Sequence, residues 1–410
     1  MVGVTSPQRK ITATAAKLLE WFPKHARDLP WRRTTDPYGV FISEVMLQQT
    51  QVSTVIPYWE RWMRALPDIS ALARARPETV LKLWEGLGYY TRARNLHRAA
   101  RLLADQNGGR FPETYAAVLA LPGIGRYTAG AICSIAFNQP TPVLDGNVMR
   151  VLTRLFALTG DPRTGRTQAR LWELAGQLVE SAAGLPPAPP LSFGNQRPGN
   201  CSMLNQALME LGATVCTPQQ PRCEPCPLRR LCAARKLGRT AQFPELAPRK
   251  PATALRMAAF VIEHRGRRLL RQRPEGVLNA HLWELPNAEW KPGEALEKVL
   301  GEALGNFAGF TVTSASDRSE RQPVVGAEPQ PPARPPSGDL VKLGTVRHSI
   351  TRYRICVEAF CLQLKQLPAH LRNHGRWVTK AEQTRLPLVS AHRKVLEKWG
   401  KENRSGGIVE

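Results

Sequence analysis

The segment from residue 121 to 147 combines a glycine-rich turn with a carboxylate. Gly123, Gly125 and Arg126 lie in the turn, which runs into a helical pattern at 128–137. Backbone N–H groups at the start of a helix can bind a phosphate, so these three residues are candidate phosphate ligands. Asp145 lies on a second turn after that helix. A phosphate anchor beside a carboxylate suits an enzyme that holds a nucleic-acid backbone and acts on the adjoining sugar.

Glu44 is a second acid that could take part in a reaction, because it is the only ionisable residue in the apolar run 40–47. A carboxyl group desolvated by such neighbours has a raised pKa and can act as a general acid. The alternative is a partly exposed Glu on an amphipathic helix. Asp145 can also be a turn or N-cap residue, where the helix dipole would keep it ionised. A protonated Glu44 and an ionised Asp145 would together suit cleavage of an N-glycosidic bond.

Four of the eight cysteines form a cluster with the spacing C-x6-C-x2-C-x5-C. They are Cys216, Cys223, Cys226 and Cys232. In a protein inside the cell, such a cluster indicates metal ligation rather than disulfides. Four thiolates can bind zinc or a [4Fe–4S] cluster. Zinc sites usually use two separate short pairs, whereas here all four cysteines lie within seventeen residues, which favours the iron–sulfur cluster.

Two aromatic residues, Tyr89 and Tyr90, follow a glycine turn, and Arg92 and Arg94 come just after them. In a basic loop, such side chains can wedge into a base stack and fill the gap left by an extruded base. Taken alone, the two tyrosines are more often core residues. The motif therefore leaves both roles open.

The chain carries 57 basic and 33 acidic residues among 410, a formal net charge of +24. Such a charge favours a polyanionic partner, although a merely basic soluble protein is the alternative. No apolar stretch is long enough to span a membrane. Because the first ten residues lack an apolar signal core, we expect a protein that stays inside the cell.

The pattern of apolar residues divides the chain into two regions. Helical spacing dominates from residue 11 to 177, for example over 43–66, and resumes at 203–214. Strand-like segments appear only later, at 256–263, 267–272 and 353–364, with helical patterns at 290–304 and 390–398. Two Pro-rich segments, 184–200 and 313–339, suggest a surface loop and a disordered insertion. The sequence therefore predicts an all-α domain at 10–235 with a cysteine loop at 216–232, a connector at 236–254, and a smaller α+β domain at 255–400.

Together these residues resemble the helix-hairpin-helix DNA glycosylases of the endonuclease III superfamily, and within it the MutY-type adenine DNA glycosylases. The resemblance is dense over residues 10–235 and thin beyond them. Its carriers are the segments 27–31, 43–51, 86–90, 121–130 and 144–148, Asn205-Gln206, and the four cysteines. It implies a base-excision-repair enzyme that removes adenine mispaired with 8-oxoguanine, or with guanine, by hydrolysing the N-glycosidic bond.

The resemblance also implies a role for each matching residue. Glu44 is expected to protonate adenine N7 and then handle the water, and Asp145 to stabilise the oxocarbenium ion with support from Tyr127 and Asn147. The adenine pocket is expected to be lined by Arg27, Trp31 and Gln206. The intercalating wedge is expected to be formed by Gln48 and Tyr89. The four cysteines are expected to bind a [4Fe–4S] cluster that holds a basic loop against phosphates.

One position distinguishes the subclasses by chemistry. Bifunctional relatives carry a lysine just after the hairpin glycines, as the nucleophile of Schiff-base formation. Here that residue is Tyr127, which cannot form a Schiff base, so we expect a monofunctional glycosylase. Its expected partner is double-stranded DNA with an adenine–8-oxoguanine or adenine–guanine mismatch, bound by a monomer in the cytoplasm at the nucleoid, with no membrane.

The C-terminal region resembles the family's Nudix-like recognition domain through the segments 258–261 and 282–286. It lacks the acidic metal-binding signature of Nudix hydrolases, so we expect no pyrophosphatase activity. The family loop that reads 8-oxoguanine usually carries Phe-Ser-His, and the aligned residues here are Ile350, Thr351 and Arg352. Thr351 keeps the hydroxyl group, so it is the candidate contact to the lesion.

Two other functions fit parts of the sequence. A mismatch-specific thymine or uracil glycosylase would keep the fold and change the base, but Gln206, Arg27 and the C-terminal domain argue against it. A protein that only binds lesions, or that sanitises the nucleotide pool, is the alternative from another class. The presence of both acids argues against the first of these, and the missing acidic signature argues against the second.

Overall fold

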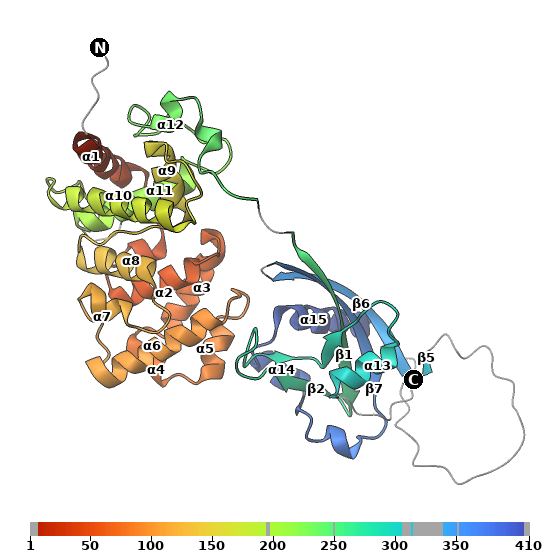
Figure 1. Ribbon diagram of the computed structural model, residues 1–410. Coiled ribbons are helices and arrows are strands. Elements are labelled where there is room, and N and C mark those ends of the chain that lie inside the picture. Colours follow the sequence, from red (N-terminus) through yellow and green to blue (C-terminus); the bar gives the residue numbers. More distant parts are fainter. Residues whose placement is uncertain are drawn as a thin grey trace, which may run out of the picture. The chain divides into compact units, whose positions relative to one another are not determined.

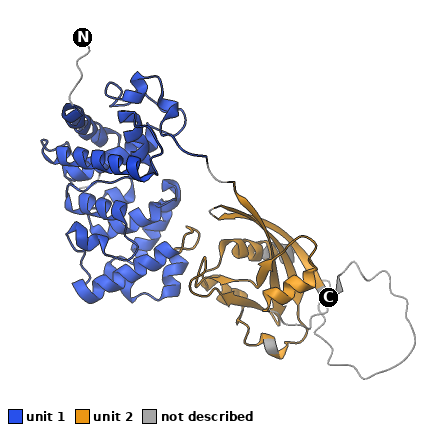
Figure 2. Ribbon diagram, viewed as in Figure 1, with its two compact units in different colours: residues 1–83, 91–248 blue, residues 84–90, 249–410 orange. Residues whose placement is uncertain are grey.

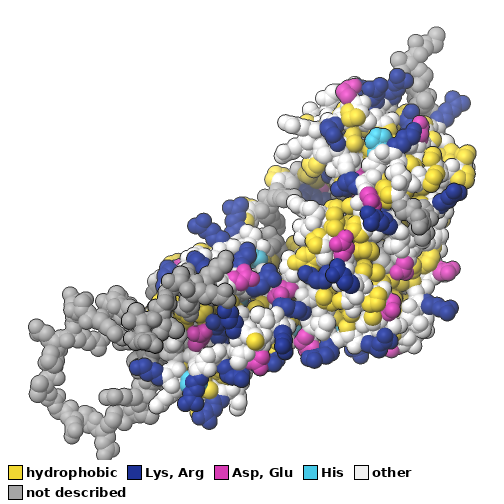
Figure 3. All heavy atoms as spheres, turned by 180° about the vertical axis from the view of Figure 1, so that it is seen from behind, with side chains coloured by type: hydrophobic (Ala, Val, Ile, Leu, Met, Phe, Trp, Pro, Cys, Tyr) yellow, Lys and Arg dark blue, Asp and Glu magenta, His cyan; other side chains and the backbone are white. Residues whose placement is uncertain are grey.

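The computed structural model describes residues 7–193, 197–248, 251–305, 313–314, 339–350 and 352–405. It divides into two compact units, residues 1–83 with 91–248 and residues 84–90 with 249–410 (Figure 2). Among the described helices, none has the length and apolar character that a membrane span requires. Lys and Arg side chains are scattered over both units on the face shown in Figure 3, in keeping with the high net charge.

The first unit is built from helices, and its described residues contain no strand, as the sequence predicted (Figure 1). Its α-helices are α1 Pro7–His25, α2 Pro37–Leu47, α3 Val52–Ala65, α4 Ile69–Arg74, α5 Pro77–Leu83, α6 Thr91–Asn107, α7 Tyr115–Leu119, α8 Arg126–Phe137, α9 Gly146–Phe156, α10 Gly165–Ala183, α11 Asn200–Thr214 and α12 Ala233–Lys236. Short 3-10 turns lie at η1 Pro30–Arg32 and η2 Thr240–Gln242. The most deeply buried helices include α2, with nine of eleven residues buried, and α11, with twelve of fifteen.

The helical pattern predicted over 43–66 is divided in the structure. Helix α2 ends at Leu47 and α3 begins at Val52. Between them Gln49 has a φ of 58°, a left-handed conformation that a continuous right-handed helix excludes. The break places the turn at residues 48–51 beside the end of α2.

The turn between α7 and α8 and the helix α8 itself each need a glycine, for different reasons. Gly123 has a φ of 77°, and a Cβ there would lie 2.5 Å from Cβ of Asn95. Gly130, inside α8, approaches the chain so closely that a Cβ would lie 2.1 Å from the carbonyl oxygen of Pro142. The small residues of this motif therefore let α8 pack directly against the segment that leads to Asp145.

The second unit contains a mixed sheet. Its strands are β1 Thr253–His264, β2 Arg267–Gln272, β3 Trp283–Glu284, β4 Asn287–Glu289, β5 Thr313–Ser314, β6 Asp339–Ile350, β7 Tyr353–Gln363 and β8 Arg376–Val378. The main order is β3-β2-β1-β7-β6-β5, with β4 paired to β1 and β8 paired to β2. Strands β1 and β7 run parallel, and β6 and β7 form an antiparallel hairpin. This arrangement confirms the predicted α+β class.

Helices cover both faces of this sheet. They are α13 Leu296–Ala303, α14 Lys380–Arg385 and α15 Ser390–Ser405, with a 3-10 turn η4 at Ala369–Leu371. On β1, Phe260 packs in the core that includes α13, whereas Val261 packs in the core that includes α15. Successive residues of a strand point to opposite faces, so burial on both faces explains why β1 is an almost continuous apolar run.

Three predicted boundaries differ from the structure. The helix expected over 290–304 begins only at Leu296, because Trp290 extends the sheet by donating its backbone N–H to the carbonyl of Arg256 at 2.8 Å. We expected a disordered insertion over 313–339, but residues 313–314 and 339 at its two ends belong to strands. Residues 315–338 lie outside the described residues. The loop expected over 184–200 ends one residue earlier, since α11 begins at Asn200.

Gly212 in α11 offers a test of the packing beside the candidate site. A Cβ at this position would lie 2.6 Å from Cβ of Asn147 and 2.9 Å from its backbone oxygen, at the start of α9. We expect Gly212→Ala to lower the free energy of unfolding by about 1–3 kcal/mol, because the two helices cannot approach as closely. The measurement is the urea unfolding curve.

The matched control is Gly176→Ala in α10, where an added Cβ would meet nothing within 4 Å. Removing a glycine from an open helix position should leave stability unchanged or raise it by up to about 1 kcal/mol. Equal unfolding midpoints for the two variants would contradict the close packing of α9 against α11.

Candidate active site

One cavity of about 500 Å³ in the helical unit is lined by most of the catalytic and substrate-binding residues expected from the sequence. Of the ten expected catalytic and substrate-binding residues, eight line it: Arg27, Trp31, Glu44, Gln48, Tyr127, Asp145, Asn147 and Gln206. They come from α2, α8, α9, α11 and the segment between α1 and α2. Residues as far apart as 27 and 206 in sequence therefore meet in one place.

Glu44 lies on α2 and is 5% exposed. Its Oε2 accepts a hydrogen bond of 2.5 Å from the hydroxyl of Tyr127 on α8. Burial raises the pKa of the Glu44 carboxyl to about 7, against the opposing effect of the Tyr127 hydrogen bond, and the charge of Asp145 adds to the rise. Burial likewise raises the pKa of Tyr127 well above its usual value, so this hydroxyl stays protonated and donates. Glu44 can therefore hold a proton near neutral pH.

Asp145 is the N-cap of α9. Its Oδ1 accepts from the backbone N–H of Val148 at 2.7 Å, and its Oδ2 accepts from the side-chain amide of Asn147 at 2.8 Å. We expected the helix dipole to keep Asp145 ionised, but burial raises the pKa of Asp145 despite these bonds. The two acids thus share one desolvated cavity.

A hydrogen-bond chain leads from Asp145 toward the cysteine loop. Arg150, one turn into α9, donates to Oδ1 of Asn147 at 2.7 Å and to the carbonyl of Gly212 at 2.8 Å. Its Nε donates to the carbonyl of Cys216 at 2.8 Å. The position of the residue that supports Asp145 therefore depends on the start of the cysteine loop.

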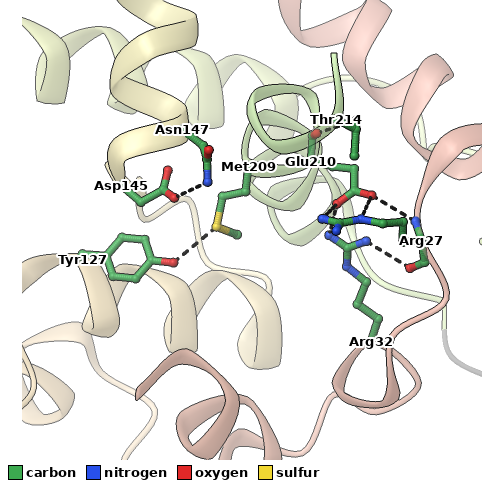
Figure 4. A network of polar contacts seen from close by, with 8 residues as sticks. All are labelled: Arg27, Arg32, Tyr127, Asp145, Asn147, Met209, Glu210 and Thr214. Carbon is green, nitrogen blue, oxygen red and sulfur yellow. Dashed lines mark hydrogen bonds and ion pairs between the residues drawn. The ribbon is translucent and has the colours of Figure 1, made fainter. Parts of the chain in front are cut away.

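Sequence reasoning missed Glu210, which lines the cavity from α11 (Figure 4). Its side chain is 1% exposed and accepts from Arg27 at 2.7 and 2.9 Å and from Arg32 at 2.8 Å. Although burial acts to raise it, the hydrogen bond from Arg27 and the charge of Arg32 lower the pKa of Glu210 to about 2. Figure 4 shows Met209 between this group and Tyr127, whose hydroxyl lies 3.3 Å from the sulfur.

Glu210 carried the same signal as Glu44, since it is the only charged residue in α11. The bidentate ion pair holds Arg27 in one orientation at the cavity wall. An anionic Glu210 beside two arginines presents both donors and an acceptor, which suits a heteroaromatic ring with mixed hydrogen-bonding edges.

Arg92 also has a role that the sequence did not show. It was considered part of a basic loop, but it is only 9% exposed. Its Nη1 donates to the carbonyls of Val45, Met46 and Gln48 at 2.7, 2.9 and 2.7 Å. This cation satisfies the carbonyl groups at the end of α2 and so positions both Glu44 and Gln48.

Two expected substrate-binding residues do not line the cavity. Tyr89 belongs to the other compact unit, has a φ of 47° and is 44% exposed. Thr351 lies outside the described residues. The phosphate candidates at the hairpin do not line the cavity either, and among them Gly125 is the N-cap of α8. Arg126 lies over the ring of Trp172, 4.0 Å from its centroid.

The four predicted cysteine ligands line a single small cavity. Beside them the buried Arg154 donates to Sγ of Cys216 at 3.4 Å and to the carbonyl of Thr217 at 2.7 Å. Burial raises the pKa of Cys226 to about 12, so this thiol would lose its proton only in exchange for a bound cation. Among the described residues, no group of three or more side chains is placed to hold a single metal ion. Four thiols around one cavity are a donor set that a zinc ion or an iron–sulfur cluster can use.

Comparison with known proteins places this geometry in a family. Residues 42–177 match the model of the HhH-GPD superfamily base excision DNA repair proteins, and residues 257–398 match the NUDIX domain. The chain is 37% identical to the adenine DNA glycosylase of Homo sapiens, over 94% of this chain and 74% of the relative. For the Mus musculus enzyme the identity is 37%, over 97% and 79%. A solved thermostable thymine-DNA glycosylase is 28% identical and covers 57% of this chain and 100% of its own, with a TM-score of 0.48.

The relatives that span nearly the whole chain act on adenine, so the thymine or uracil alternative is not supported. The helical unit holds the buried Glu44 and the half-buried Asp145 in one cavity, and the second unit has the expected Nudix-like sheet. The chain therefore belongs to the adenine DNA glycosylases, base-excision-repair enzymes that hydrolyse N-glycosyl bonds in DNA.

Proposed function

We propose that this enzyme removes adenine paired with 8-oxoguanine or guanine in double-stranded DNA, acting as a monofunctional monomer in the cytoplasm at the nucleoid. The observation that carries the proposal is the meeting of Glu44 and Asp145 in one buried cavity, with Tyr127 donating to Glu44. A protonated acid and a carboxylate on one cavity wall are what cleavage of an N-glycosidic bond requires.

In the proposed mechanism Glu44 transfers its proton to N7 of an extruded adenine. The bond between C1′ and N9 then breaks, and its electron pair leaves with the neutral base. Asp145, held by Asn147 and the start of α9, stabilises the positive charge that develops on the sugar. Glu44, now a carboxylate, accepts a proton from the water that attacks C1′.

The base pocket is proposed to include Arg27, Trp31, Gln206 and the ion-paired Glu210. Trp31 is 7% exposed and Gln206 is 6% exposed, so both are nearly covered before any base enters. A pocket whose donors and acceptors are already fixed rejects bases with the wrong edge, because their polar groups would stay unpaired. Recognition of the opposite base is assigned to the segment 350–352.

We also propose that Cys216, Cys223, Cys226 and Cys232 hold a [4Fe–4S] cluster. When bound, the cluster would be ligated by the four thiolates and would fix the loop 216–232 as a rigid element. Arg154 would remain beside it as a buried donor to sulfur. Through the bond from Arg150 to the carbonyl of Cys216, an ordered loop would also support the start of α9.

Glu44→Gln tests the acid assignment. The substitution keeps the shape of the side chain but removes the proton donor, so the single-turnover rate of adenine release should fall by about 10²–10⁴-fold. The substrate is an adenine–8-oxoguanine duplex, with an adenine–guanine duplex measured beside it and expected to react more slowly. Strand breaks should appear only after alkali, because Tyr127 cannot form a Schiff base.

The matched control is Glu20→Gln, which removes an exposed carboxylate from α1 and should leave the rate unchanged. Release by Glu44→Gln at near the wild-type rate would show that another group supplies the proton. Rapid strand cleavage without alkali would contradict the monofunctional assignment, and equal rates on the two duplexes would contradict lesion preference.

The dependence of the single-turnover rate on pH follows from the two acids in the cavity. Because the pKa of Glu44 is about 7 and the protonated form is the active one, the single-turnover rate should fall as pH rises through 7. It should also fall at low pH, where Asp145, whose pKa is raised by burial, becomes protonated. The measurement is the rate between pH 5 and 9, and a rate that keeps rising above pH 8 would be incompatible with Glu44 as the acid.

Metal content tests the cluster. Purified protein should contain about four iron atoms per chain. Cys226→Ser should lose most of the iron, whereas Cys356→Ser, in the second unit, should keep it. Elemental analysis gives the answer directly, and stoichiometric zinc in place of iron would overturn the assignment.

A further inference from the structure

Met209 on α11 is a residue of the active-site cavity to which the proposed mechanism gives no role. It is half-buried, and among the described residues that line this cavity it is the only one with a sulfur atom. Met46 and Met203, by contrast, are 0% and 1% exposed. A small molecule that enters the cavity of about 500 Å³ therefore meets the side chain of Met209.

The hydroxyl of Tyr127 lies within hydrogen-bond distance of two acceptors. Oε2 of Glu44 is 2.5 Å away, and the sulfur of Met209 is 3.3 Å away (Figure 4). A hydroxyl group has one proton to donate, so the two acceptors compete for it. A thioether sulfur is a weak acceptor, and the carboxyl oxygen of Glu44 therefore prevails. This hydrogen bond occupies Oε2 and leaves Oε1 to carry the proton that Glu44 transfers to adenine.

Oxidation of the Met209 sulfur would reverse this competition. In the reaction with hydrogen peroxide, a lone pair of the sulfur attacks one peroxide oxygen and the O–O bond breaks. The other oxygen leaves with both protons as water, so the sulfur loses two electrons and the peroxide gains them. The product, methionine sulfoxide, is neutral and polar. Its oxygen is a stronger acceptor than the thioether sulfur, and it lies on the side chain that already contacts Tyr127.

We propose that Met209 is a modification site whose oxidation by peroxide draws the hydroxyl of Tyr127 away from Glu44 and slows adenine release. The inference rests on the proposed function, since Glu44 is the acid of that mechanism. Without its donor Glu44 holds its proton more tightly, because the carboxylate left after proton transfer loses a stabilising hydrogen bond. Oxidation therefore leaves the charge of the enzyme unchanged but makes its acid weaker.

The other groups around Glu44 are not changed by this modification. Burial is the main cause that raises the pKa of Glu44, the charge of Asp145 on the start of α9 adds to the rise, and that of Arg32 opposes it. Arg27 and Glu210 line the same cavity and remain paired. A sulfoxide adds no charge, so a shift in the pKa of Glu44 after oxidation reports the loss of its hydrogen bond.

The test compares three full-length proteins before and after a limited treatment with hydrogen peroxide: the wild type, Met209→Leu and Met149→Leu. Met149 on α9 is also half-buried but does not line the cavity, so it is the matched control. The measurement is the single-turnover rate on the adenine–8-oxoguanine duplex, and each treated protein is compared with the same protein before treatment.

We expect the treatment to slow the wild type and Met149→Leu by about 10- to 100-fold, the range for one hydrogen bond to a charged group. Met209→Leu should slow by less than about twofold, because a leucine cannot form a sulfoxide. Iron content is measured in the same samples, since damage elsewhere in the protein would slow all three proteins alike.

Met209→Gln tests the hydrogen bond without peroxide, because its amide oxygen is a strong neutral acceptor in place of the sulfur. On the plateau of the pH profile we expect a rate about 10- to 100-fold below that of Met209→Leu. The high-pH limb, where the rate falls as Glu44 loses its proton, should move to higher pH, since the hydrogen bond from Tyr127 lowers the pKa of Glu44. Treated wild-type protein should show the same displacement of the limb.

Three results would overturn the proposal. The treatment could slow Met209→Leu as much as the wild type, so that residue 209 would not be the sensitive site. The limb could stay at the same pH while the rate falls, which would show that the sulfoxide only blocks the cavity. Mass spectrometry of the treated wild type could find the added oxygen on other methionines and none on Met209. Failure of the proposed function is distinguishable, because untreated wild-type protein would then release no adenine, whereas mass spectrometry would still show whether Met209 is oxidised.

Discussion

Burial of two carboxyl groups in one cavity is the constraint on which the active site depends. Burial raises the pKa of both Glu44 and Asp145, and the charge of Asp145 adds to the rise at Glu44. Which of the two carboxyl groups keeps its proton is decided by their separate hydrogen-bond partners. Glu44 has a tyrosine hydroxyl as its donor, whereas Asp145 has the start of a helix and an amide. The residue with more donors is the better carboxylate, so the acid and the anion are assigned by surrounding geometry rather than by residue type.

Such a cavity requires that α2, α8, α9 and α11 keep their positions, and one buried and two half-buried arginines help to hold them. Arg92 binds the carbonyls at the end of α2, and Arg150 joins α9 to α11 and to the cysteine loop. Arg27 is fixed by Glu210. Each cation satisfies backbone or carboxylate groups that would otherwise be buried without a partner. Part of the net charge of +24 is therefore structural and does not face a polyanion.

Local sequence patterns predicted a structural feature correctly where its physical cause lies in neighbouring residues. The isolated acid in an apolar run predicted Glu44, and the glycine-rich turn predicted the start of α8. They were insufficient where distant residues interact. The pair of Arg27 and Glu210 joins positions 183 residues apart, and no periodicity relates them. Arg92 was predicted in a basic loop, because a sequence does not show which cation will meet the carbonyls of α2. For the same reason, the helical pattern over 43–66 did not predict the residue at which α2 ends.

The arginines of the active-site cavity act through the direction of their hydrogen bonds as well as through charge. Arg27 and Arg32 share the single carboxylate of Glu210, so one positive charge remains among the three groups. The ion pairs fix the N–H groups of both guanidinium groups. A neutral base is recognised by the positions of its donors and acceptors, because it carries no charge for a cation to attract. Selectivity at this site therefore depends on how Glu210 holds the two arginines.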